Sequence, residues 1–91
     1  MIEINTISNS DPYEFDVTVK EGGTETQHRV TMGTAFYRRL TNGKVSPEKC
    51  VEAAFKFLLD REPKESILGT FDVSVISRFF SDFREAFPKY L

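Results

Sequence analysis

The chain has very few of the residues that build disulfides, metal sites and histidine-based catalysis. It contains one cysteine, one histidine and no tryptophan among 91 residues. A single cysteine forms neither an internal disulfide nor a cysteine-based zinc site, and a single histidine supplies at most one imidazole ligand. No HxxxH, CxxC or clustered-carboxylate loop completes a metal site. We therefore expect no metal and no cofactor.

Long apolar runs are also absent. No segment approaches the ~18 consecutive apolar residues of a membrane span. The first residues, Met1 to Asn5, contain neither the basic leader nor the apolar stretch of a signal peptide. With five glycines and four prolines, the composition is also unlike that of a disordered or fibrous chain. The sequence predicts one cytoplasmic domain over residues 1–91, with no membrane segment.

Charge is low overall and unevenly distributed. The net charge is −2, but the segment 28–49 holds five bases and one acid. These bases surround a predicted helix, turn and helix. Helix-turn-helix proteins that bind DNA have the same order of elements and place their second helix in the major groove. A net negative chain lacks the basic character typical of phosphate binding, so nucleic-acid binding through 29–49 is the alternative function. The bases are Arg29, Arg38, Arg39, Lys44 and Lys49.

Residues 13–32 have the pattern of a β-hairpin. Phe15, Val17 and Val19 alternate with polar residues, and Gly22-Gly23 supplies the positive φ angles of a tight turn. A similar alternation over 2–7 predicts a third strand. A two-residue loop pairs Phe15 with Val30, Val17 with His28, Val19 with Thr26, Asp16 with Arg29, and Lys20 with Glu25.

Two helices are predicted over about 32–41 and 47–61. Asn42-Gly43 ends the first of them. Ser46 as N-cap and Pro47 at the first helical position form the strongest start signal in the chain. The second helix has an apolar face broad enough to contact two elements, so we expect it to be the central helix, packed between the hairpin and the last helix.

The segment 73–87 separates into an apolar and a polar face at helical spacing and predicts a third helix, which Ser81 permits to be unbroken. Its apolar stripe is expected to belong to the core. A small domain need not cover every aromatic residue of the stripe, and uncovered ones would form a binding patch or a dimer interface. The stripe consists of Val73, Val75, Ile76, Phe79, Phe80, Phe83, Ala86 and Phe87.

The runs FLLDREPKESIL at 57–68 and FDVSVISRFF at 71–80 resemble a set of short bacterial proteins usually labelled hypothetical. The stretches 37–40 and 46–48 fit the same pattern, so the resemblance covers nearly the whole chain. It implies a bacterial origin and an α+β fold, but no reaction and no ligand. Members often carry proline where this chain has Ser81, and proline there would kink a helix or start a new one.

No recognisable catalytic constellation is present, and we expect no catalytic residue. Cys50 lies in the first turn of the central helix, but on its apolar side, which favours a core position. His28 is expected to be a packed imidazole with a local hydrogen bond. The sequence places four more carboxylates close together, and a surface loop accounts for them: Asp60, Glu62, Glu65 and Asp72.

Together these patterns predict an α+β domain, in which a two- or three-stranded antiparallel N-terminal sheet packs on three main helices. The favoured function is a small non-enzymatic protein-interaction or regulatory module that acts through a protein partner or self-association. Two points stay open here: whether the C-terminal stripe is wholly core or partly an interface, and whether the last helix kinks near Ser81. The candidate interaction residues are Arg38, Arg39, Lys44, Phe80, Phe83 and Phe87.

Overall fold

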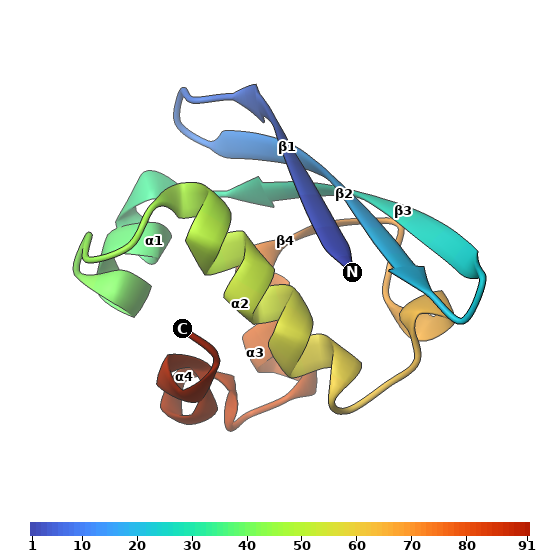
Figure 1. Cartoon of the computed structure of the whole chain (residues 1–91). Coiled ribbons are helices and arrows are strands. Elements are labelled where there is room, and N and C mark those ends of the chain that lie inside the picture. The colour runs from blue at the N-terminus through green and yellow to red at the C-terminus, as the bar shows by residue number, and fades with distance from the viewer.

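A four-stranded mixed sheet and four helices make up the α+β fold of the computed structural model, which describes residues 1–91 (Figure 1). The strands lie in the order β1-β2-β3-β4 and are β1 Ile2–Ser8, β2 Tyr13–Glu21, β3 Thr24–Met32 and β4 Thr70–Asp72. The helices are α1 Thr34–Thr41, α2 Pro47–Leu59, α3 Ile76–Phe79 and α4 Phe83–Ala86. Three single turns of 3-10 helix complete the chain: η1 Lys64–Ser66, η2 Val73–Val75 and η3 Phe87–Tyr90.

The predicted hairpin register is confirmed at every pair, from Phe15 with Val30 to Lys20 with Glu25. Gly22 and Gly23 both have positive φ angles, 64° and 82°, as a primed two-residue turn requires. The third strand is also confirmed, since β1 pairs antiparallel with β2. One side of this sheet is therefore mostly apolar, and five of its side chains are fully buried: Phe15, Val17, Val19, Val30 and Met32.

Strand β4 was not predicted. It pairs parallel with β3 through Val30 and Phe71 and their two neighbouring pairs. With only three residues, it is too short to show a period-two pattern in the sequence. The Thr31 hydroxyl donates to the Asp72 carboxylate at 2.6 Å across this pair. Because Thr31 belongs to β3, helix α1 begins at Thr34, later than expected.

Helix α2 is the central helix, as predicted, and in Figure 1 it runs between the sheet and α4. The Ser46 side chain accepts a hydrogen bond from the Lys49 N–H at 3.1 Å, which confirms the N-cap. On the sheet side, the ring of Phe55 lies 5.4 Å from that of His28. On the other side, the ring of Phe57 lies 4.9 Å from that of Phe83. The helix is 13 residues long, and no helix of the structure is both long and apolar enough to cross a membrane.

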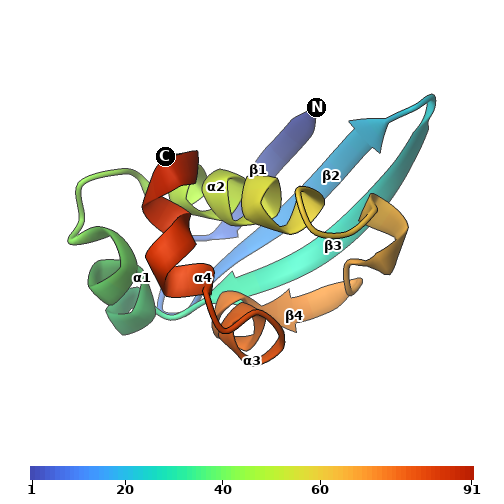
Figure 2. The ribbon, with the colours of Figure 1, turned by 90° about the horizontal axis from the view of Figure 1, so that it is seen from below.

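The segment 73–87 does not form the single helix predicted from its spacing. Phe80 is extended, with φ −130° and ψ 95°, and it separates α3 from α4. Contacts with distant residues replace the helical hydrogen bonds here: the Phe80 ring packs 5.8 Å from that of Phe57, and Asp82 accepts a 2.6 Å hydrogen bond from Arg61. Tertiary contacts therefore override a helical pattern that Ser81 would permit. In Figure 2, α3 and α4 are two separate short helices joined by a loop.

Candidate functional site

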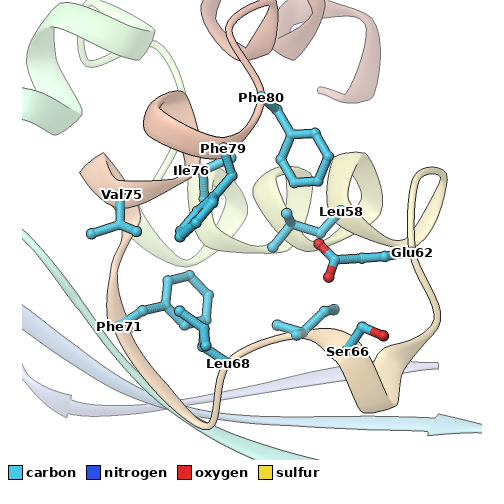
Figure 3. A pocket seen from close by; sticks show the side chains of 10 residues that line it. Leu58, Glu62, Ser66, Leu68, Phe71, Val75, Ile76, Phe79 and Phe80 are labelled. Carbon is cyan, nitrogen blue, oxygen red and sulfur yellow. The ribbon is translucent and has the colours of Figure 1, made fainter.

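A groove of about 220 Å³ opens between the end of α2, the loop after η1, and α3 (Figure 3). Ten residues line it, and eight of them are hydrophobic. These residues come from four parts of the chain, so the groove exists only in the folded protein. Its walls include Leu58 from α2, Ile67 and Leu68 from the loop, Phe71 from β4, and Phe79 and Phe80 from the end of α3.

The groove has a buried floor and an exposed rim. Ile67 and Ile76 are 7% and 3% exposed, whereas Leu68 and Phe79 are 51% and 68% exposed. Phe79 is left outside because α3 ends directly after it and the extended Phe80 turns the chain toward Phe57. A large exposed phenyl ring beside an apolar hollow is typical of a binding surface.

Glu62 is the one ionisable residue among those that line the groove. Figure 3 shows its carboxylate directed into the space near Leu58 and Phe80. The carboxylate has no hydrogen bond and no ion pair within the chain. Burial among apolar side chains raises the pKa of Glu62 above its ordinary value of 4.5. The group is therefore partly desolvated and without a counter-charge.

The groove offers apolar contact and one carboxylate, and the Ser66 hydroxyl is its other polar side-chain group. Its volume is below the roughly 300–1,000 Å³ of pockets that hold drug-sized ligands. The size therefore suits one or two protruding side chains. This is the chemistry of recognition, with hydrophobic burial as the main attraction.

No family model, curated protein or solved structure matches this chain. The functional interpretation of the groove therefore rests on its geometry and its charge.

Cys50 and His28 both lie in the core. Cys50 is fully buried, with its Sγ 3.6 Å from the Met32 Sδ, and burial raises the pKa of the thiol to about 12. The expected core position of Cys50 is confirmed. The His28 Nδ1 lies 2.7 Å from the Leu68 carbonyl oxygen, and its Nε2 lies 2.8 Å from the Thr26 hydroxyl. His28 therefore ties the Leu68 backbone, and with it one rim of the groove, to β3.

The four carboxylates that are close in the sequence do not form one site. Asp60 accepts a hydrogen bond from the Tyr90 hydroxyl at 2.7 Å, and Glu65 forms an ion pair with Lys64 at 2.8 Å. Asp72 accepts hydrogen bonds from Thr31 and Ser74, and no cluster of three potential metal-binding side chains exists. Glu62 alone faces the groove.

The basic candidate residues divide into paired and unpaired ones. Arg29 forms ion pairs with Glu14 and Asp16, and Lys49 lies 3.5 Å from Glu52. Arg38 and Arg39 in the last turn of α1, and Lys44 in the following turn, form no ion pair. Arg38 borders a shallow polar depression with Tyr37, Asn42 and Gly43.

The aromatic candidates also separate. Phe80 lines the groove. Phe83 and Phe87 are fully buried, with their rings 5.6 Å apart. They belong to the core and present no surface to a partner, which corrects the expectation that they join the interaction surface. The rim residue Phe79 was placed on the apolar stripe but not among the six candidate residues, because helical spacing gives the apolar face but not which part of it is covered. The other rim residue, Leu68, lies outside that stripe.

Proposed function

We propose that this chain is a small non-enzymatic protein-interaction module whose docking site is the apolar groove beside Phe79. The observation that carries the proposal is the exposed Phe79 ring, 68% accessible, next to a hollow lined by eight hydrophobic residues. Water leaves both surfaces when an apolar side chain of a partner protein enters, and this release supplies the binding free energy.

The shape of the groove supports a preformed docking site. Its floor is part of the core cluster, because Ile67, Phe71 and Ile76 are each at most 9% exposed. A floor held by core packing loses little conformational freedom on binding, which favours affinity in a small site. The exposed rim residues supply the additional apolar contact.

Site-specific crosslinking tests the docking site. The photoreactive residue benzoylphenylalanine is placed at position 79, and in a matched control at position 84, where Arg84 is exposed on α4. The resemblance and the composition predict a bacterial, cytoplasmic setting, so irradiation is carried out in bacterial cytoplasmic lysate.

We expect a discrete protein adduct from position 79, none of that mass from position 84, and loss of the adduct when Leu68→Ser is added. If position 79 captures no protein beyond the position 84 control, the groove is not a docking site and the proposal fails.

Nucleic-acid binding through 29–49 stays a prediction, favoured by the unpaired Arg38, Arg39 and Lys44. It is expected to use α1 and the turn after it, because α2 buries seven of its residues in the core. The test is binding to mixed DNA or RNA at low salt, with affinity that falls steeply as salt rises and weakens in Arg38→Ala. No binding at low salt would remove this alternative.

A further inference from the structure

The charge of the groove indicates what its occupant carries. Figure 3 shows Glu62 at one end of the groove and Val75 at the other, with Phe79 and Phe80 on one side and Leu68 and Phe71 facing them. The carboxylate of Glu62 is thus the one charged group that an occupant of the groove meets. A partly desolvated anion at the end of an apolar groove attracts a cation more strongly than the same anion in open water.

The bases that flank Glu62 in the sequence are engaged elsewhere. The Arg61 guanidinium bonds to Asp82 at 2.6 Å and lies 3.7 Å above the centre of the Phe57 ring. The Lys64 ammonium, on a side chain only 7% exposed, bonds to Glu65 at 2.8 Å. No cation of this chain neutralises the Glu62 carboxylate, so the position is open to a cation from outside.

We propose that the segment bound in the groove carries a hydrophobic side chain directly next to an arginine, and that the guanidinium pairs with Glu62 while the hydrophobic side chain fills the space beside Phe79. This inference rests on the proposed function, because it names the chemistry of the partner at the same docking site. The argument is charge complementarity between one anion and one cation across an apolar contact.

Arginine fits this position better than lysine. A planar guanidinium donates two parallel hydrogen bonds to one carboxylate and stacks on aromatic faces, and the groove is lined by the carboxylate of Glu62 and by the rings of Phe79 and Phe80. An acidic residue at the same position of the partner would place two carboxylates of like charge together beside apolar walls. The groove therefore discriminates against acidic segments as well as favouring basic ones.

Three capped dipeptides that differ in one side chain test the inference. They are acetyl-Phe-Arg-amide, its neutral isostere acetyl-Phe-citrulline-amide, and acetyl-Phe-Glu-amide. Binding is followed by the backbone amide NMR shifts of Leu68 and Phe71 in the full chain. The variants are Glu62→Gln, and Glu85→Gln as a matched control, because Glu85 is exposed on α4 and lies outside the groove.

We expect the arginine dipeptide to bind the native chain about five-fold more tightly than the citrulline dipeptide, and the glutamate dipeptide most weakly. Glu62→Gln should abolish this preference and leave citrulline binding unchanged, whereas Glu85→Gln should retain the preference. Equal binding of the arginine and citrulline dipeptides to the native chain would overturn the inference and leave the docking site standing. If none of the dipeptides shifts the groove amides, both the inference and the docking site fail.

Discussion

The two halves of the C-terminal aromatic segment contain the same residue types and lie in opposite environments. In the half that ends α3, Phe79 is 68% exposed and Phe80 lines a groove. In the half that forms α4 and η3, Phe83 and Phe87 are fully buried. The two halves are separated by the extended backbone at Phe80.

The difference teaches that a hydrophobic stripe in the sequence identifies an apolar face but not which of its residues other parts of the chain bury. The ring of Phe57 on α2 contacts Phe80, Phe83 and Tyr90, all of which lie at or after the break. The chain thus turns at Phe80 so that its last residues close over α2. The residues before the break keep part of their apolar surface and form one side of the groove.

Truncation of Phe83 should have the largest effect. Phe83→Ala removes a fully buried ring that packs against Phe57 and Phe87, and we expect a loss of about 3–5 kcal/mol in the free energy of unfolding. Urea unfolding followed by circular dichroism measures it. A loss no larger than that of Phe79→Ala would contradict the division between a core half and a surface half.

Removal of Arg61 should have an intermediate effect. Its guanidinium joins the turn after α2 to Asp82 and covers the Phe57 ring of α2, so Arg61→Ala should lower the Tm by roughly 4 °C through lost packing and pairing. The matched control is Arg78→Ala on α3, because Arg78 is exposed and forms no ion pair. Equal Tm values for the two variants would mean that Arg61 does not hold the second half in place.

A smaller, pH-dependent effect is expected at Glu62. The pKa of Glu62 is higher in the folded chain than in the unfolded chain, so ionisation above pH 4.5 costs folding stability, and the cost disappears below that pH. Glu62→Gln should raise the Tm at about pH 7, by less than Arg61→Ala lowers it, and leave the Tm unchanged at about pH 3.5. Calorimetry at the two pH values measures this, with Glu85→Gln as the control. If Glu62→Gln instead lowered the Tm at about pH 7, the groove would stabilise the ionised carboxylate, and the expectation would be contradicted.

The smallest effect on stability is expected at Phe79. Because the ring is mostly exposed, Phe79→Ser should change the free energy of unfolding by no more than about 0.5 kcal/mol. The same variant should lose binding at the groove, as measured by the dipeptide titration. A large loss of stability would show that Phe79 belongs to the core in solution.

Local patterns were sufficient for much of the fold. The hairpin register follows from the alternation around Phe15, Val17 and Val19 together with the Gly22-Gly23 turn, since a shift by one residue would expose the apolar face. The N-terminus of α2 follows from Ser46 and Pro47. Strand β4 could not be predicted in the same way, because three residues carry no period.

The candidate site was predictable only in part. Phe80 was selected from its place on the apolar stripe, and it lines the groove. Leu68 was not among the candidate residues, and Glu62 was assigned to a surface loop. A leucine before a glycine, and a glutamate before the proline that follows a helix, give no local sign that they meet in space.

The sequence by itself determined the hairpin, the N-cap of α2 and the core position of Cys50, because each follows from a pattern within one continuous stretch of the chain. Only the tertiary structure decided which phenylalanines are covered and that Glu62 faces an apolar groove. The physical reason is that these outcomes depend on contacts between distant residues. Arg61 and Asp82 are 21 positions apart, and Phe57 must be covered by the chain beyond Phe80.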